Sequence, residues 1–130
     1  MTIKCKVKSI EPLACNTYQI LLHPETPVAF KAGQYLMVEM GEKDKRPFSI
    51  ASAPGAEFIE LQIGAFGEDS YAMQVIEKIK SSSSVMIEMP LGNAYLRTES
   101  DRPLILLAGG TGFSYIKSMF EYLVATQSDR

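Results

Sequence analysis

The stretch Pro103–Ser114, PLILLAGGTGFS, decides the fold of the C-terminal part of the chain. Its first half, Leu104–Ala108, is apolar without alternation, which is typical of a strand buried on both faces of a parallel sheet. Three glycines follow, Gly109, Gly110 and Gly112, and glycine accepts positive φ and lets a ligand approach the backbone closely. The stretch therefore predicts a strand, a glycine loop and a helix, an order in which dinucleotide phosphates are often bound.

The glycine loop leads into a predicted helix over residues 114–125, with three apolar side chains on one face: Ile116, Phe120 and Leu123. Thr111 and Ser114 add hydroxyl groups at the helix N-terminus, where the helix dipole favours anions. The full dinucleotide fingerprint is not present, because no third glycine follows Gly112 at the expected place. Two interpretations stay open, a site for phosphate or nicotinamide and a tight turn without a ligand.

Upstream, the apolar residues alternate as they do in half-buried strands, beginning with Ile3, Cys5 and Val7. Further strands are predicted over residues 18–22, 35–40, 48–51, 59–63 and 85–89. One helix interrupts them, with apolar residues at 72, 75, 76 and 79 and with Asp69 or Ser70 as its N-cap. This pattern predicts a six-stranded antiparallel Greek-key barrel with one helix over an opening.

A polar linker, Glu99–Arg102, separates the two patterns. We therefore expect a barrel domain over residues 1–98 and the first βα unit of a parallel nucleotide-binding domain over residues 99–130. A single βα unit cannot cover both faces of a parallel strand, so this second domain is expected to be incomplete.

Composition excludes several classes of function. The chain has 130 residues, 46% of them hydrophobic, and a formal charge of −2, without the basic stripe of a nucleic-acid-binding protein. Cys5, Cys15 and the single histidine, His23, have no metal-ligand spacing, so no metal site is expected. No apolar run is long enough to span a membrane. A cytoplasmic protein with free thiols is the expectation.

A second motif lies within the barrel region, Arg46–Ser49 (RPFS). A flavin site needs a cation to offset the charge of the reduced ring, a surface for stacking and a hydrogen-bonding group near N5. Arg46, Phe48 and Ser49 supply one of each. The alternative is a charged turn entering a strand, with Phe48 in the core, and the tetrapeptide by itself does not decide between the two.

Three segments in this order, Ala32–Leu36, Arg46–Ser52 and Ala108–Tyr115, resemble the ferredoxin–NADP reductase-like flavoproteins. The likeness is greatest to the small NAD(P)H:flavin oxidoreductases that release free reduced flavin, including those associated with bacterial luciferase. It extends over the whole chain, which is expected to cover little more than half of such an enzyme. The resemblance implies hydride transfer from nicotinamide C4 to flavin N5, with NADH or NADPH as donor.

The resemblance also assigns residues. It implies flavin contacts for Arg46, Pro47, Phe48, Ser49 and Gly64, with Ser49 near N5 and Arg46 stabilising the reduced ring. It implies nicotinamide nucleotide contacts for Gly109, Gly110, Thr111, Gly112 and Phe113.

Two departures from the wider family concern the flavin. Many members have tyrosine where this chain has Phe48, and members that hold FAD place its diphosphate near the start of the barrel's helix, where this chain has Glu68 and Asp69. Carboxylates there would repel a diphosphate, although simple helix capping is an equally open interpretation. We expect riboflavin or FMN to bind weakly, as a substrate, and FAD not to be held stably.

The flavin reductase is one of three hypotheses. The second is an electron-transfer reductase that serves an iron–sulfur partner. The third is a non-catalytic flavin-binding fragment that associates with itself through Leu104–Leu107. For the first, the expected acceptor of reduced flavin is a flavin-using monooxygenase or a luciferase.

Overall fold

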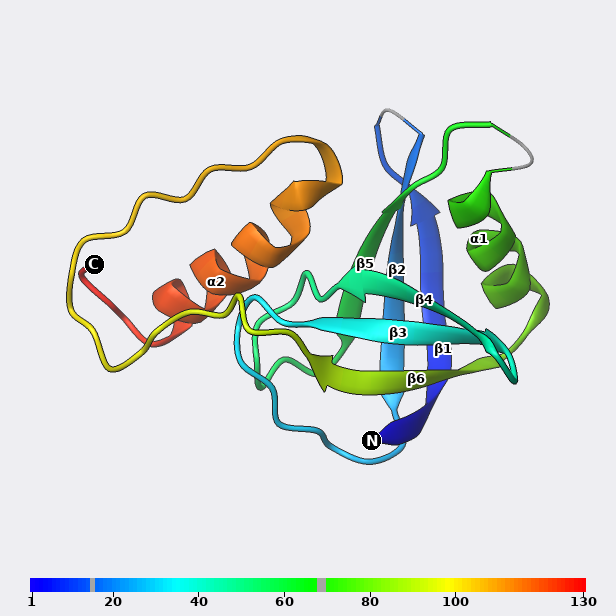
Figure 1. Ribbon diagram of the computed structural model, residues 1–130, viewed down its shortest axis with the longest axis horizontal. Helices are drawn as coiled ribbons and strands as arrows, with labels where there is room; N and C mark the ends of the chain where they lie inside the picture. Colours follow the sequence, from blue (N-terminus) through cyan, green and yellow to red (C-terminus); the bar gives the residue numbers. More distant parts are fainter. Residues whose placement is uncertain (15, 68–69) are drawn as a thin grey trace.

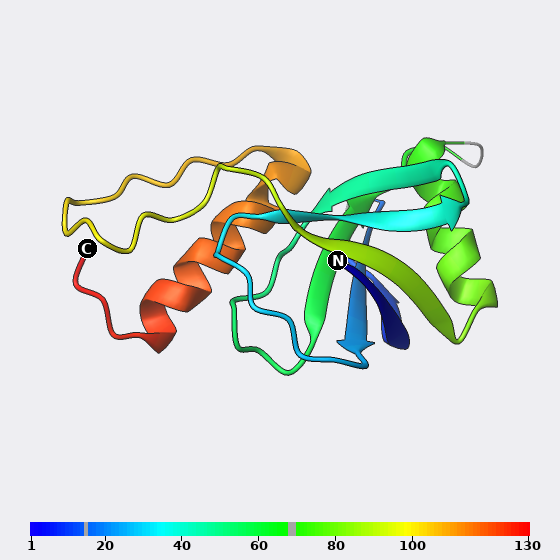
Figure 2. The ribbon, with the colours of Figure 1, turned by 60° about the horizontal axis from the view of Figure 1, so that its bottom comes forward.

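The computed structural model describes residues 1–14, 16–67 and 70–130. Within these residues the regular structure consists of six strands, two α-helices and one 3₁₀ turn. The elements are β1 (Thr2–Pro12), β2 (Thr17–Pro24), β3 (Tyr35–Gly41), β4 (Asp44–Ser49), β5 (Ile59–Gly64), α1 (Tyr71–Ser81), β6 (Ser84–Leu91), η1 (Gly110–Gly112) and α2 (Phe113–Ala125). The helices α1 and α2 lie on opposite sides of the strands (Figures 1 and 2).

The strands form one antiparallel sheet with the order β4-β3-β6-β1-β2-β5. The sheet curls so that its two edge strands approach each other (Figure 1). Just past β4, the N–H of Ala51 donates to the carbonyl oxygen of Glu60 in β5, at 2.8 Å. The neighbours of β6 are β1 and β3, which are distant from it in sequence. The predicted Greek-key barrel with one helix is confirmed.

Alternation places the side chains of β1 as the sequence predicts. Ile3 and Cys5 are buried, whereas Lys4 and Lys6 are exposed. The barrel interior is filled by aliphatic side chains with no exposed surface, among them Ile20, Leu22, Leu36, Val38, Leu61, Ile87 and Met89. Removal of this apolar surface from water is the main driving force for closing the barrel.

The strand β4 begins earlier than predicted. It covers Asp44–Ser49 instead of residues 48–51, because the charged turn after β3 has only two residues, Glu42 and Lys43, between paired positions 41 and 44. The side chain of Lys45 is accommodated outside the barrel by an ion pair with Glu88, at 2.7 Å. Arg46 is therefore already part of the sheet, and its side chain has a fixed direction.

Helix α1 has the predicted apolar face. Val75, Ile76 and Ile79 are buried in the barrel core, and the Ser70 hydroxyl caps the helix by accepting a hydrogen bond from the Met73 N–H at 3.0 Å. The alternative cap, Asp69, lies outside the described residues, as do Glu68 and Cys15.

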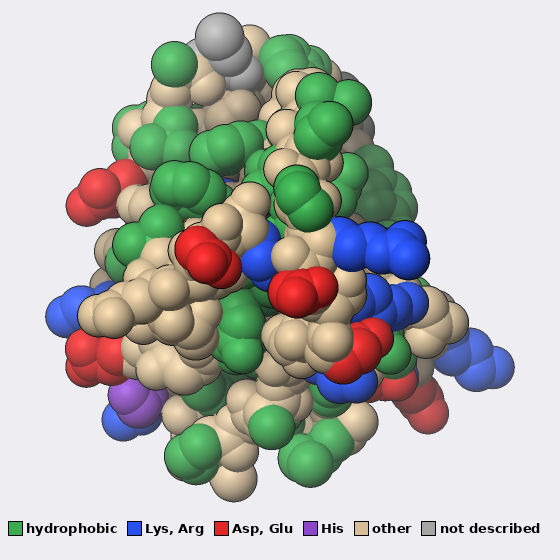
Figure 3. Space-filling model, turned by 90° about the vertical axis from the view of Figure 1, so that its left-hand side faces the viewer, with side chains coloured by type: hydrophobic (Ala, Val, Ile, Leu, Met, Phe, Trp, Pro, Cys, Tyr) green, Lys and Arg blue, Asp and Glu red, His purple; other side chains and the backbone are tan. Residues whose placement is uncertain are grey.

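The segment before the glycine loop differs from the prediction. Residues 103–109 run extended but are not assigned to a strand, because no strand lies beside them in the described chain to supply hydrogen bonds. Leu104 and Leu106 pack towards α2, whereas Ile105 is 86% exposed and Leu107 is 78% exposed. The face of the molecule on the α2 side consequently displays hydrophobic side chains, especially in its upper half (Figure 3).

The buried face of α2 also differs in part from the prediction. Ile116 and Leu123 pack on a small cluster built around Ala32, Leu96 and Met119, separate from the barrel core. Phe120, predicted to lie on the same face, is 59% exposed. The reason is that two polar side chains of α2, Lys117 and Ser118, face the barrel, so the buried face of the helix differs from the purely apolar face that was predicted. The boundary between residues 98 and 99 stays a prediction.

Candidate functional site

The motif Arg46–Ser49 presents its side chains alternately to the two faces of β4. Arg46 pairs with Val38 and Phe48 with Leu36, two β3 residues without exposed surface. Paired residues of an antiparallel sheet lie on the same face, so Arg46 and Phe48 are on the core side. Pro47 and Ser49 lie on the other face, where Ser49 is opposite Tyr35.

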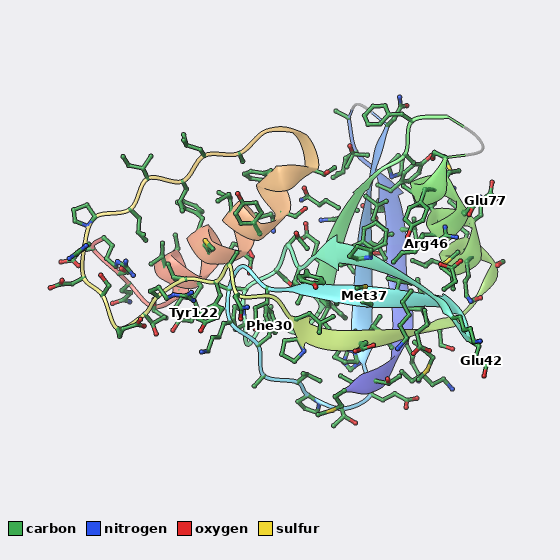
Figure 4. The ribbon with its side chains drawn as sticks, in the orientation of Figure 1. Phe30, Met37, Glu42, Arg46, Glu77 and Tyr122 are labelled. Atoms are coloured by element: carbon green, nitrogen blue, oxygen red, sulfur yellow. The ribbon has the colours of Figure 1, made fainter. Side chains whose placement is uncertain are left out.

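The guanidinium group of Arg46 is already occupied. Its Nε and Nη2 donate to the two carboxylate oxygens of Asp44, at 3.0 and 2.8 Å, and Nη1 donates to the carbonyl oxygen of Tyr71 at 2.9 Å. The group also stacks on the Tyr71 ring, 4.1 Å from its centroid, and in Figure 4 the Arg46 side chain lies towards α1. The hydrogen bonds from Arg46 hold the pKa of Asp44 below its usual range. Arg46 therefore joins β4 to the start of α1, with its charge balanced by Asp44.

The glycine loop leaves the N-terminus of α2 accessible. Gly110 has φ +56°, and a Cβ placed on Gly109, Gly110 or Gly112 would meet no atom within 4 Å. The first turn of α2 has no acidic residue, and the structure describes no side-chain cap on the helix. The N–H groups at this end of the helix, together with its dipole, suit an anionic group.

The two hydroxyl groups of the loop lie in different surroundings. Thr111 is exposed, whereas Ser114 is 2% exposed and its Oγ has no hydrogen-bond partner among the described residues. A buried hydroxyl without a partner is uncommon in folded proteins.

A hollow of about 700 Å³ joins the barrel to the glycine loop. It is lined by Leu13, Ala14, Thr17, Gln62, Gly64, Phe66, Gly109, Gly110, Thr111 and Phe113. A Cβ on Gly64 would lie 3.1 Å from Thr111 Cγ2 and 3.4 Å from Phe66 Cε2, so glycine at this position permits the close approach. Phe66 and Phe113 are 69% and 48% exposed, which leaves two aromatic rings available to a flat ligand.

The structure thus brings together one group of the predicted site residues, Gly64 with Gly109, Gly110, Thr111 and Phe113. The residues of the RPFS motif are not among those lining this hollow. Their predicted contacts with flavin stay predictions.

No protein-family model matches the chain. An "NAD(P)H-flavin reductase" of Vibrio harveyi is 60% identical to it, over 96% of this chain and 55% of the relative. A protein of the same name from Aliivibrio fischeri is 58% identical, over 98% of this chain and 56% of the relative. A crystallised variant of ferredoxin–NADP⁺ reductase from Plasmodium falciparum superposes with a TM-score of 0.81 at 19% identity, over 99% of this chain and 55% of that chain.

The chain is similar over nearly its whole length to part of the two NAD(P)H-flavin reductases, and its fold is that of the ferredoxin–NADP⁺ reductase. It spans about 55% of the length of the curated relatives it matches. The structural likeness, at low identity, shows the family fold, and the sequence likeness confirms the resemblance drawn from the RPFS and glycine-loop motifs.

In this chain, α2 and the barrel meet through a polar contact that the sequence analysis did not predict. Ser118 Oγ donates to the carbonyl oxygen of Ser52 at 2.7 Å, and Lys117 Nζ lies 3.0 Å from Glu60 Oε1. Lys117 and Glu60 are separated by 57 positions, so no local pattern links them. The signal available in the sequence was the polar pair Lys117-Ser118 in the middle of a largely apolar helix.

No group of three or more His, Cys, Asp or Glu side chains in residues 1–14, 16–67 and 70–130 is placed to hold a metal ion. Over the same residues, neither helix has the length and apolar character needed to cross a membrane.

Proposed function

We propose that this chain provides the flavin-binding barrel and part of the nucleotide site of an NAD(P)H:flavin oxidoreductase. The observation that carries the proposal is the hollow in which Gly64 of the barrel and the glycine loop before α2 face each other. Hydride transfer requires two flat rings in contact, and proximity and orientation supply much of the rate. The names of the two Vibrionaceae relatives support the same reaction.

At the flavin end, Ser49 is the proposed hydrogen-bonding residue near N5, the atom at which a bound flavin accepts a hydride. Its position on the outer face of β4, opposite Tyr35, supports this, because the hydroxyl is not enclosed in the barrel core. Phe48, on the inner face, packs against the barrel core and supports the strand that carries Ser49. Arg46 is the proposed cation for the reduced ring, a role that requires its guanidinium to exchange the Asp44 carboxylate, its present hydrogen-bond partner, for the flavin.

At the nucleotide end, the accessible N-terminus of α2 supports binding of a nicotinamide nucleotide. The glycines leave the backbone open, and no carboxylate stands in the first turn of the helix to repel a phosphate. Phe113 and Thr111 then border the ring that donates the hydride.

We further propose that riboflavin or FMN is a weakly held substrate. A diphosphate near the start of α1 would require a free cation, and Asp44 and the Tyr71 carbonyl already engage the Arg46 guanidinium there. We therefore expect the dissociation constants of riboflavin and FMN to agree within about threefold, a difference of less than 1 kcal/mol. Purification of the chain with stoichiometric FAD would overturn this part of the proposal.

The proposed acceptor of reduced flavin is a flavin-using monooxygenase or a luciferase, and the proposed compartment is the cytoplasm. The electron-transfer hypothesis differs in requiring a tightly held flavin and an iron–sulfur partner.

The experiment is flavin-dependent oxidation of NADH and of NADPH by the purified 130-residue chain, with riboflavin and FMN each in excess. Turnover above the rate without flavin supports the reductase. A matched pair of variants locates the activity: Gly110→Ala strains the glycine loop, while Gly55→Ala introduces the same change at another open position with positive φ. No turnover by the folded chain would leave the third hypothesis, a non-catalytic flavin-binding fragment.

A further inference from the structure

Helix α2 is joined to the barrel by a compact set of polar contacts, which we call the α2–barrel junction: Lys117 and Ser118 of α2 with Ser52 and Glu60 of the barrel. Ser118 has no exposed surface, and its hydroxyl donates to the carbonyl oxygen of Ser52 at 2.7 Å. The Ser52 hydroxyl in turn accepts a hydrogen bond from the Glu60 N–H at 3.0 Å. The junction therefore links α2 to two neighbouring barrel segments, which lie 57 and 66 positions earlier in the sequence.

The charged part of the junction is shielded from water. The side chains of Glu60 and Lys117 are 9% and 22% exposed. Lys117 Nζ has three acceptors, Glu60 Oε1, Glu121 Oε1 and, at 3.5 Å, the carbonyl oxygen of Ala51. The second oxygen of Glu60 accepts from Gln62 Nε2 at 2.8 Å. A largely buried pair with this many partners is geometrically demanding, which distinguishes it from an exposed surface ion pair.

Partial burial alone would lower the pKa of Lys117, but the hydrogen bonds and charges of Glu121 and Glu60 outweigh burial and raise it above the usual value. The ammonium form is thus held at neutral pH. The Lys117 side chain accordingly acts as a fixed, charged contact between helix and barrel.

Both sides of the junction are connected to the candidate site by short, rigid stretches. On the barrel side, Ser52 follows Ser49 closely, and Glu60 lies in β5, the strand that ends at Gly64. On the helix side, Lys117 is one helical turn from Phe113, where the glycine loop enters α2. A shift of Lys117 relative to Glu60 would move the glycine loop relative to the barrel by a similar amount.

We propose that Lys117 is a positioning residue, which holds α2 against Glu60 so that the glycine loop presents the nicotinamide at hydride-transfer distance from a flavin on the barrel. This inference rests on the proposed flavin reductase function. Misplacement of reacting groups by about 1 Å can cost roughly 100-fold in rate, so loss of this contact should lower the rate of hydride transfer measurably.

The kinetic test replaces Lys117 by methionine, which keeps the length of the side chain and removes its charge. We expect kcat/KM for NADH or NADPH to fall by about 10- to 100-fold, while the dissociation constant of riboflavin, measured by fluorescence quenching, stays within about twofold. Lys117→Arg is expected to restore most of the activity, because arginine is always charged and can bridge both carboxylates. Lys4→Met is the control, since it removes the charge of an exposed lysine on β1.

A double variant separates positioning from stability. Lys117→Met leaves Glu60 buried without a cation, which destabilises the fold, whereas Glu60→Gln/Lys117→Met leaves no unpaired buried charge. The double variant is expected to recover the thermal stability of the parent chain and to keep the kinetic defect. Recovery of both stability and kcat/KM would show that Lys117 matters only for folding and would overturn the proposal.

A second readout does not depend on turnover. Amide hydrogen exchange over residues 112–116, the hydrogen-bonded end of the glycine loop and the first turn of α2, should be faster by about 10-fold in the double variant, with exchange in β1 and β6 unchanged. If the parent chain shows no turnover, the proposed function fails, and the exchange data still decide whether the junction holds the loop. Unchanged exchange in the loop, or faster exchange with unchanged kcat/KM, would each contradict the positioning role.

Discussion

Ser49 stands at the end of β4, on the opposite face of the strand from Arg46 and Phe48. If its hydroxyl hydrogen-bonds near flavin N5, the bond strengthens as charge develops in the transition state. We expect Ser49→Ala to lower kcat by about 10-fold or more, because loss of one preorganised donor costs on the order of 10²-fold in favourable cases. The affinity for riboflavin should change by less than about threefold.

The measurement is steady-state oxidation of NADH with saturating riboflavin, together with fluorescence titration of the flavin. Ser83→Ala is a suitable control because Ser83 is exposed and lies outside the strands, in the connection between α1 and β6. A kcat equal to that of the parent chain would remove Ser49 from the mechanism.

The buried thiol of Cys5 leads to a prediction about the pH dependence of stability, which is independent of the proposed function. Burial, with a smaller contribution from the charge of Glu25, raises the pKa of the Cys5 thiol from 9.0 to about 12. Above about pH 9 the unfolded chain loses the thiol proton while the folded chain keeps it, so the folded state binds more protons and stability falls as pH rises. This group should contribute a slope of up to about −1.4 kcal/mol per pH unit between the two pKa values.

Urea unfolding measured between about pH 8 and about pH 11 checks this expectation. Cys5→Ala is less stable throughout because it leaves a cavity, but its free energy of unfolding should fall less steeply over the same pH range. Parallel slopes for the two proteins would show that Cys5 is not protonated selectively in the folded state.

At the scale of elements, α1 begins with a capped N-terminus. The Ser70 hydroxyl accepts a hydrogen bond from the Met73 N–H at 3.0 Å. Ser70→Ala should therefore lower the free energy of unfolding by about 1 kcal/mol, the usual cost of losing a serine cap. Chemical denaturation measures the change, and Ser83→Ala, at an exposed serine, should stay within about 0.5 kcal/mol of the parent chain.

The elements also show what sequence could predict. The alternation around Ile3 and Cys5 and the helical spacing of Val75, Ile76 and Ile79 determine burial locally, so β1 and α1 follow from the sequence. The extended segment 103–109 does not, because a strand needs a partner strand as well as an apolar sequence. The exposure of Phe120 likewise depends on how α2 docks.

The candidate site was also predictable only in part. The sequence predicted the glycine loop between a strand and a helix, whereas the structure has extended chain without a strand before the loop, and the approach of Gly64 to Thr111 was not predicted. The pairing of Arg46 with Asp44 was missed, although the two residues are close in sequence, since the early start of β4 was not anticipated. The link from Lys117 to Glu60 depends on tertiary packing alone.

At the scale of the whole molecule, the barrel and the α2 region have separate hydrophobic clusters. The barrel core is extensive, whereas the second cluster has three buried members, Ala32, Leu96 and Met119. Local stability follows the amount of buried apolar contact, so the α2 region is expected to open more readily than the barrel. The α2–barrel junction then supplies a large part of what holds α2 in place.

The same region gives the molecule an exposed apolar face. Ile105 and Leu107 are 86% and 78% exposed on an extended segment, and Phe120 and Val124 of α2 are 59% and 62% exposed. Extended backbone with unpaired hydrogen-bonding groups and adjacent apolar side chains favours contact with another chain. We therefore expect this 130-residue chain to associate with itself as its concentration rises.

Sedimentation velocity over a range of concentrations measures this association. Ile105→Lys/Leu107→Lys places charges on the exposed side of the segment and leaves Leu104 and Leu106, which pack towards α2, unchanged. We expect the double variant to weaken association by about 10-fold or more, that is by at least 1.4 kcal/mol.

Met86→Lys, at a partly exposed position on β6, adds a charge elsewhere and should have no such effect. A parent chain that stays monomeric at every concentration would contradict the expectation, and equal weakening by Met86→Lys would attribute the association to net charge and not to this face.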